Sequence, residues 1–222
     1  PGAVRKEGTR WVGRNGEGRT LRVATAFADW PPDDRQPPWS DVAYLRMYDD
    51  PAFDYVAYNT VRMYDRRLAR PGKAVADLWE RIVGILPSWQ ERFRIDGVMI
   101  DMGHSLPAEL KDRIIGAARE RDPAFAFWDE KFPVDEESRA EGYNAVIGYS
   151  WLATCRPDEL EKLLGRAGGE GFPLPFFATA ESHNSPRAAA RAGGEVHSRG
   201  AFPFLCALPA VAWLHNGFEL GE

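Results

Sequence analysis

Acidic side chains, histidines and an asparagine follow three short apolar runs of this sequence. They are Asp101 and His104 after residues 97–100, Asp129 and Glu130 after residues 124–128, and Glu181, His183 and Asn184 after residues 176–180. Carboxyl and imidazole groups can act together in nucleophilic and acid–base chemistry, or can bind a divalent cation. A single Asp at such a position is often only a helix cap or a loop residue. Three groups of this kind in one chain instead favour a shared site.

The apolar runs are typical of buried strands, and amphipathic helical patterns separate them. Strands are predicted at residues 97–101, 124–128, 145–149, 176–180 and 211–214, and helices at residues 74–92, 106–121, 136–141, 157–167 and 199–207. This alternation predicts an α/β fold with parallel strands and right-handed crossovers. A barrel gathers its catalytic side chains at the carboxyl ends of such strands. The polar groups therefore favour a barrel over an open, doubly wound sheet.

The first third of the chain has weaker patterns. Residues 1–20 are rich in glycine and arginine without a period, and residues 21–27 are predicted to form a strand. Residues 29–40 hold four prolines, which predict an irregular loop at the wall of a site. Residues 52–70 are predicted to contain a short helix, and Pro87 is expected to bend the last turn of the helix at 74–92.

Composition excludes several classes of partner. The net charge of −5, without a block of Lys or Arg, argues against a nucleic acid or an anionic membrane. No apolar run has the length of a membrane span, so a cytoplasmic protein is expected. The chain begins with Pro rather than Met, which suggests that its amino terminus is missing. Cys155 and Cys206 are expected to be free, buried thiols.

Four segments resemble motifs of the α-amylase-type glycoside hydrolases. Residues 95–101, IDGVMID, resemble the motif at the family's fourth strand, with Asp101 at the nucleophile. Residues 125–132, FAFWDEKF, match the fifth-strand motif and place Glu130 at the acid/base. Residues 177–187, FATAESHNSPR, resemble the seventh-strand motif, and residues 213–222, WLHNGFELGE, resemble the segment after the eighth strand.

The resemblance implies a (β/α)8 TIM barrel of which this chain holds only part. Residues 73–222 correspond to about strands 4 to 8, and residues 1–72 to an irregular segment from the loop region after the third strand. A retaining glycosidase or transglycosylase acting on an oligosaccharide or α-glucan is implied, without a cofactor or metal. Asp101, Glu130 and Asn184 fall on its catalytic positions, and substrate binding is expected of His183, Glu181, His104 and Arg187.

Two departures from the family motifs leave alternatives open. Met99 stands where the family has an Arg that keeps the nucleophile ionised, and Asn184 stands where it has a third catalytic Asp. In another register, Arg94-Ile95-Asp96 matches the family's R-x-D, and Asp96 becomes the nucleophile. A sugar-binding barrel that has lost catalysis is the second alternative.

A metal site is the third alternative. Asp101, His104, Glu181 and His183 carry the carboxylate and imidazole groups that bind divalent ions. Their spacing in the sequence matches no compact metal motif, however.

Overall fold

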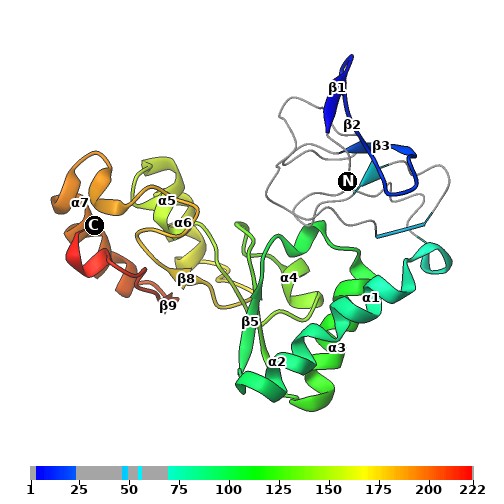
Figure 1. The fold of residues 1–222 in the computed structure, drawn as a ribbon. Coiled ribbons are helices and arrows are strands. Elements are labelled where there is room, and N and C mark those ends of the chain that lie inside the picture. The colour runs from blue at the N-terminus through cyan, green and yellow to red at the C-terminus, as the bar shows by residue number, and fades with distance from the viewer. Residues whose placement is uncertain (1–3, 24–46, 50–54, 57–69, 222) are drawn as a thin grey trace. The chain divides into compact units, whose positions relative to one another are not determined.

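The computed structural model describes residues 4–23, 47–49, 55–56 and 70–221 (Figure 1). The chain forms two compact parts. The first part comprises Pro1–Asp96 and Asp101–Phe125, and the second comprises Gly97–Ile100 and Ala126–Glu222. Strand β5 (Gly97–Ile100) thus belongs to the second part, although its neighbours in sequence belong to the first. The predicted loop at residues 29–40 lies outside the described residues.

The first part contains a small sheet where irregular chain was expected. β1 (Arg5–Glu7), β2 (Arg10–Arg14) and β3 (Thr20–Val23) pair antiparallel in that order (Figure 1). Gly8 closes the first hairpin at a φ of +60°, which suits glycine. Asn15 supports the second turn, because its side-chain oxygen accepts from the amides of Glu17 and Arg19. The prediction of irregular chain is therefore wrong for β1 and β2. Residues 21–23 of β3 confirm the start of the strand predicted at residues 21–27, and residues 24–27 lie outside the described residues.

The predicted helix at residues 52–70 is wrong where the structure describes it. β4 (Tyr55–Val56) pairs parallel with β3. The rest of that range lies outside the described residues.

The helices of the first part begin and end close to their predicted positions, with one correction. The predicted helix at 74–92 is two helices, α1 (Ala76–Val83) and α2 (Ile85–Phe93), which meet at Gly84 rather than bending at Pro87. A proline ring clashes with the carbonyl four residues earlier, whereas the first turn of a new helix tolerates it. The helix is therefore interrupted one turn before Pro87. α3 (Ala108–Arg121) packs against α1 and α2.

The second part carries the predicted parallel strands. β5, β6 (Ala126–Asp129) and β7 (Ala145–Val146) are parallel neighbours in chain order. A parallel bridge between Val146 and Phe176 leads to β8 (Phe177–Ala178), which pairs parallel with β9 (Val211–Ala212). The predicted order, direction and α/β class are confirmed, although most of these strands are shorter than predicted. Among the described residues the strands close no barrel.

Short helices follow these strands. They are α4 (Glu136–Ala140), α5 (Ser150–Ala153), α6 (Pro157–Gly168), the 3-10 helix η3 (Ala188–Ala190), α7 (Gly194–Cys206) and the 3-10 helix η4 (Phe218–Leu220). α7 begins five residues before its predicted start at residue 199. No helix in the described ranges is long and apolar enough to cross a membrane.

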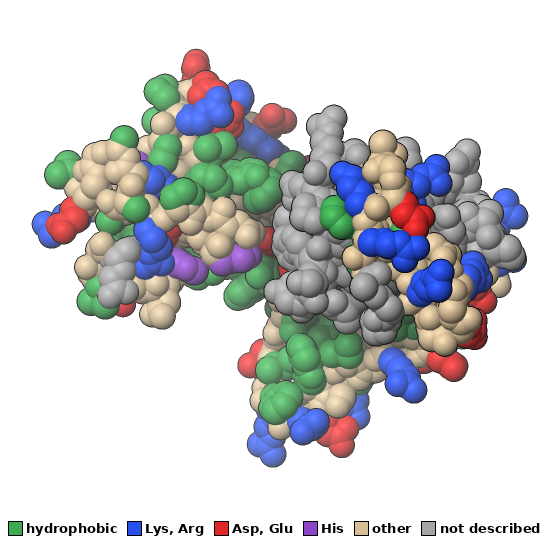
Figure 2. Space-filling view, turned by 45° about the horizontal axis from the view of Figure 1, so that its top comes forward, with side chains coloured by type: hydrophobic (Ala, Val, Ile, Leu, Met, Phe, Trp, Pro, Cys, Tyr) green, Lys and Arg blue, Asp and Glu red, His purple; other side chains and the backbone are tan. Residues whose placement is uncertain are grey.

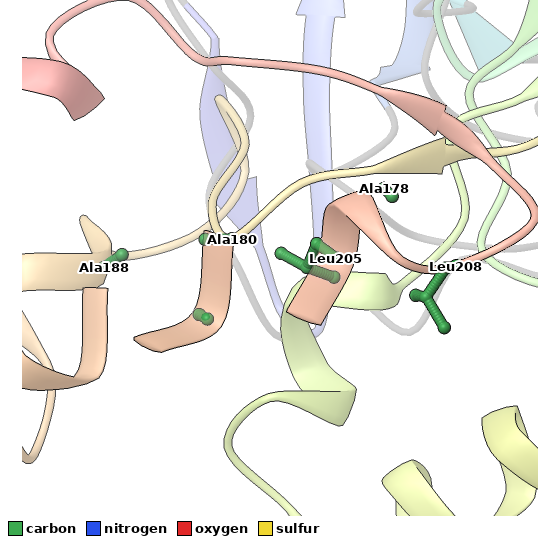
Figure 3. Close-up of a cluster of buried hydrophobic side chains, with 6 residues drawn as sticks. Ala178, Ala180, Ala188, Leu205 and Leu208 are labelled. Carbon is green, nitrogen blue, oxygen red and sulfur yellow. The ribbon is translucent and has the colours of Figure 1, made fainter. Parts of the chain in front are cut away.

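Small side chains build the core beneath α7. Ala178, Ala180 and Ala188 lie against Leu205 and Leu208 in a buried cluster (Figure 3). Because alanine side chains are short, α7 can approach β8 and η3 closely and bury Leu205 there, and Leu208 follows just after the helix.

The two cysteines correct one expectation. Cys155 and Cys206 are free thiols, as predicted, but both are exposed rather than buried.

Candidate active site

Glu130 lies at the centre of a polar cluster in the second part. It follows β6, and its amide donates to the carbonyl of Ile100 at 3.4 Å. Its side chain is only 4% exposed. Asn184 Nδ2 donates to Glu130 Oε1 at 2.5 Å, and His183 Nε2 lies 3.3 Å from the same oxygen. Three predicted site residues from two distant segments therefore meet at one carboxylate.

Asn184 also contacts His183 directly. Asn184 Nδ2 and His183 Nε2 are 3.1 Å apart, and both side chains are exposed on their outer sides. Histidine side chains (purple) reach the surface close to hydrophobic side chains in the view of Figure 2. The cluster thus joins a buried carboxyl to two polar groups that are open to solvent, which is an arrangement suited to a polar ligand.

Tyr149 is a site neighbour that the sequence did not indicate. Burial raises the pKa of Tyr149, and the negative charge of Glu130 raises it further. The ring stacks on Phe132, with ring centroids 3.5 Å apart, and meets the edge of Trp151 at 5.4 Å. Tyr149 is the last residue of the strand predicted at 145–149. Its position at the carboxyl end of that strand is the feature of the sequence that could have indicated a site residue.

A second row of aromatic rings crosses the strands of this part. Trp128 meets Phe177 edge-on at 4.7 Å, and Phe177 meets Trp213 at 5.4 Å. Trp128 is 43% exposed. Such rings offer apolar faces of the kind that pack against sugar rings.

Asp129, the neighbour of Glu130, has a different environment. It is buried and accepts a hydrogen bond from Ser138 Oγ at 2.7 Å. Burial raises the pKa of Tyr143, and the charges of Asp129 and Glu141 raise it further. Asp129 therefore holds α4 against β6, whereas Glu130 faces the polar cluster.

Glu181 and Arg187 form an internal network. Glu181 is 1% exposed, and its Oε2 accepts from the amide of Ala188 at 2.6 Å. Arg187 Nη1 forms an ion pair with Glu181 Oε1 at 2.8 Å. Among the described residues, Glu181 Oε1 accepts no hydrogen bond of good geometry. Arg187 Nη2 donates to the carbonyl of Asn216 at 3.0 Å. The substrate-binding roles expected for both residues stay predictions.

Asp101 and His104 belong to the first part. Asp101 is exposed in the turn after β5, and His104 is exposed in the 3-10 helix η2 (Gly103–Ser105). The pairing of Asp101 with Glu130 stays a prediction, as does the role of His104.

The alternative nucleophile precedes β5 rather than following it. Asp96 lies within the first part beside Arg94, Arg121 and Asp122, which line an open surface hollow of about 470 Å³ with it. Met99, at the position of the family's Arg, is 37% exposed in β5.

The described residues show no metal centre. In residues 4–23, 47–49, 55–56 and 70–221, no three His, Cys, Asp or Glu side chains are grouped so as to hold a metal ion.

Three solved structures that this chain resembles in fold are glycoside hydrolases. The chain superimposes on the α-amylase of Anoxybacillus with a TM-score of 0.55 and 14% identity, covering 67% of this chain and 37% of that enzyme. The Geobacillus thermoleovorans α-amylase complexed with acarbose superimposes with a TM-score of 0.56 and 14% identity, covering 67% of this chain and 38% of that enzyme. The cyclic α-maltosyl-(1→6)-maltose hydrolase of Arthrobacter globiformis, complexed with maltose, superimposes with a TM-score of 0.58 and 14% identity. The match covers 81% of this chain and 45% of that enzyme.

These comparisons define the class at the level of the fold. The chain shares an α/β fold with α-amylase-family glycoside hydrolases, which confirms the resemblance read from the sequence motifs. It spans 37–45% of the length of the three enzymes. No protein-family model and no curated protein sequence matches the chain.

Proposed function

We propose that this chain is the carboxyl-terminal part of the catalytic barrel of a retaining glycosidase or transglycosylase that acts on α-glucans or related α-glucosides. The observation that carries the proposal is the meeting of Glu130, His183 and Asn184. These residues come from two segments that resemble the fifth- and seventh-strand motifs of one family. Both segments follow parallel strands, and barrel enzymes carry out catalysis at the carboxyl ends of such strands.

Glu130 is the proposed acid/base. A retaining enzyme needs one carboxyl that protonates the leaving oxygen and one carboxylate that attacks the anomeric carbon, about 5–5.5 Å apart. Glu130 is nearly buried, and Asn184 fixes the direction of its carboxyl through a hydrogen bond. A fixed carboxyl can give its proton to a glycosidic oxygen without first losing rotational freedom.

Asp101 is the proposed nucleophile. Ile100 and Asp129 are paired in the register of β5 and β6, and Asp101 and Glu130 are the residues that follow them. Asp96 instead precedes β5, so the strand separates it from the carboxyl end of β6. The register therefore favours Asp101 over Asp96. Attack by Asp101 forms a glycosyl–enzyme ester, and water or a second sugar then releases the glycosyl group with Glu130 as the base.

Aromatic and imidazole groups are the proposed sugar contacts. Tyr149 is close enough to Glu130 for the carboxylate charge to raise the pKa of its hydroxyl. Its ring, with Phe132 and Trp151, supplies apolar faces, and His183 supplies a hydrogen-bonding nitrogen. Two of the similar solved enzymes are complexed with acarbose and with maltose, which supports a ligand built of α-linked glucose. We propose that Arg187 contacts the sugar at the edge of the site and that the buried Glu181 serves binding by holding Arg187 in place.

Turnover by the intact protein tests the assignment. An aryl α-glucoside and a maltooligosaccharide are compared in the wild type and in Glu130→Gln and Asp101→Asn. Glu130→Gln lowers the turnover rate of the maltooligosaccharide by about 100-fold or more. It lowers the turnover rate of the activated aryl glycoside less, because a good leaving group needs little protonation. Asp101→Asn abolishes turnover of both and keeps sugar binding. Glu159→Gln, on α6 and paired with Lys162, is the matched control. Full activity of either site variant overturns its assignment.

A sugar-binding protein without turnover is the second candidate. Asn184 presents an amide to Glu130, and an amide cannot supply the negative charge that stabilises an oxocarbenium-like centre. Calorimetric titration of the intact protein with maltooligosaccharide distinguishes the two. Saturable binding without product release favours this candidate, whereas turnover excludes it.

A further inference from the structure

One arginine contacts the polypeptide on both sides of the candidate site residues His183 and Asn184. Residues 180–187 lie in the connection between β8 and η3 and carry both side chains. Arg191 Nη1 donates to the carbonyl of Ala180 at 2.8 Å, before these residues. Arg191 Nη2 donates to Ser185 Oγ at 3.0 Å and to the carbonyl of Pro186 at 2.7 Å, after them. A single guanidinium therefore binds both ends of the segment.

The turn between these ends is closed by two serines. The amide of Ser182 donates to Ser185 Oγ at 2.8 Å, and the amide of Ser185 donates to the carbonyl of Ser182 at 3.1 Å. The hydroxyl that accepts from Ser182 is the one that also accepts from Arg191. The guanidinium thus donates to a hydroxyl that closes the turn, and His183 and Asn184 occupy the two middle positions of this turn.

Arg191 is itself held from the opposite side. Nη1 lies 3.4 Å from the carbonyl of Trp151 and 3.4 Å from Cys155 Sγ, and the guanidinium carbon lies 5.2 Å from the centre of the Trp151 ring. Within the described part of the chain, its acceptors are neutral oxygens and a sulfur, without a carboxylate. Hydrogen bonds from a charged donor are stronger than those between neutral groups, so this arrangement anchors the segment to α5.

We infer that Arg191 is a positioning residue that fixes residues 180–187 so that His183 and Asn184 face Glu130. Its role in sugar chemistry rests on the proposed function of the Glu130 cluster. A lysine cannot replace it, because one ammonium group cannot reach acceptors at both ends of the segment, whereas the planar fork of the guanidinium does so with two nitrogens.

Hydrogen–deuterium exchange of the intact protein tests the inference without any sugar. Arg191→Met keeps an apolar stem beside Trp151 but removes the donors. In Arg191→Met and in Arg191→Lys, amides of residues 182–188 exchange about 10-fold faster or more, because the turn opens locally, while β6 keeps its protection. Arg199→Met is the matched control, since Arg199 pairs with Glu195 on the exposed face of α7. If the amides of residues 182–188 exchange at the wild-type rate in both Arg191 variants, the inference is overturned.

Kinetics with rescue separate positioning from a general loss of structure. Arg191→Gly turns over an aryl α-glucoside about 10-fold or more slowly than the wild type, and added methylguanidinium restores part of kcat because it fills the space of the missing group. The same additive leaves Arg199→Gly unchanged. Slow turnover that methylguanidinium does not restore, together with unchanged exchange, contradicts the positioning role. If the wild type turns over no glycoside, the proposed function fails, and the exchange measurement still decides the role of Arg191.

Discussion

Asn184 is the residue at which this site differs most from the motif that it resembles. Its amide nitrogen contacts both Glu130 and His183, so an uncharged amide links the carboxyl to the imidazole. In Asn184→Asp, the new carboxyl would face the carboxyl of Glu130 at hydrogen-bond distance. Two carboxyl groups so close cannot both ionise readily, and the pair retains one proton.

This geometry predicts the effect of Asn184→Asp on turnover. The retained proton keeps the pair able to act as an acid at higher pH, and a negative charge now faces the reacting sugar. We therefore expect a higher kcat than in the wild type and an alkaline limb of the pH–rate profile that moves to higher pH. Steady-state kinetics across pH measure both, with Asn184→Ala as the uncharged control. A lower rate with an unmoved limb identifies the asparagine as part of a specialised site.

Tyr149 reports on the charge of Glu130. Burial and the negative charge of Glu130 both raise its pKa, because each opposes formation of the phenolate. Glu130→Gln removes the charge and leaves the burial, so the pKa of Tyr149 falls but stays above the ordinary value of 10.0. The ultraviolet difference titration between proteins with and without Tyr149→Phe isolates this one phenol. An unchanged pKa places the two residues too far apart to share a site.

At the scale of elements, Gly97 sets the distance between β5 and β6. A Cβ at this position meets the carbonyl oxygen of Ala126 at 2.7 Å and its Cβ at 2.9 Å. Both distances are shorter than real contacts, and one of the atoms belongs to the rigid backbone of β6. The glycine of the IDG motif is therefore needed for the pairing that brings the ends of these two strands together.

Gly97→Ala is expected to lower the free energy of unfolding by about 1–3 kcal/mol, the usual cost of overfilling a packed site. Chemical denaturation measures the loss. Gly116→Ala on α3 is the matched control, because a Cβ there meets nothing within 4 Å and alanine gains up to about 1 kcal/mol in a helix. Equal stability of Gly97→Ala and the wild type means that β5 can move away from β6 at no cost.

At the scale of the whole molecule, β5 links the two compact parts through the backbone. It pairs with β6 in the second part, yet α2 precedes it and α3 follows it in the first. Loss of the first part frees both ends of this four-residue strand, which then has only its pairing with β6 among the described strands to hold it. The two parts are therefore expected to unfold in one coupled transition.

Leu110→Ala tests the coupling, since Leu110 is fully buried on α3 in the first part. The substitution costs about 2–5 kcal/mol through the cavity that it leaves. We expect one transition at lower temperature in calorimetry, together with faster hydrogen exchange at the amides of β6. Ala117→Gly, half-buried on the same helix, controls for a local loss of helix stability of about 1 kcal/mol. Two separate transitions, of which only one moves, contradict the coupling.

The sequence by itself indicated the order and direction of the strands and a shared region for the polar residues that follow them. Both depend on local patterns, because short apolar runs alternate with helical periods and polar residues directly follow the runs. The same local patterns failed at residues 5–14, whose short strands lack apolar alternation, and at Gly84, where Pro87 interrupts the helix one turn earlier than expected.

Only the tertiary structure decided which polar residues meet in the candidate site and which hold the fold. Asp129 and Glu130 are adjacent in sequence, yet one bonds to Ser138 in the interior and the other meets Asn184, 54 positions away. Tyr149 and Arg191 acquire their roles in the same way, through neighbours that are distant in the chain. Such contacts depend on the packing of separate elements, and a local sequence pattern does not encode the direction in which one side chain leaves a strand end.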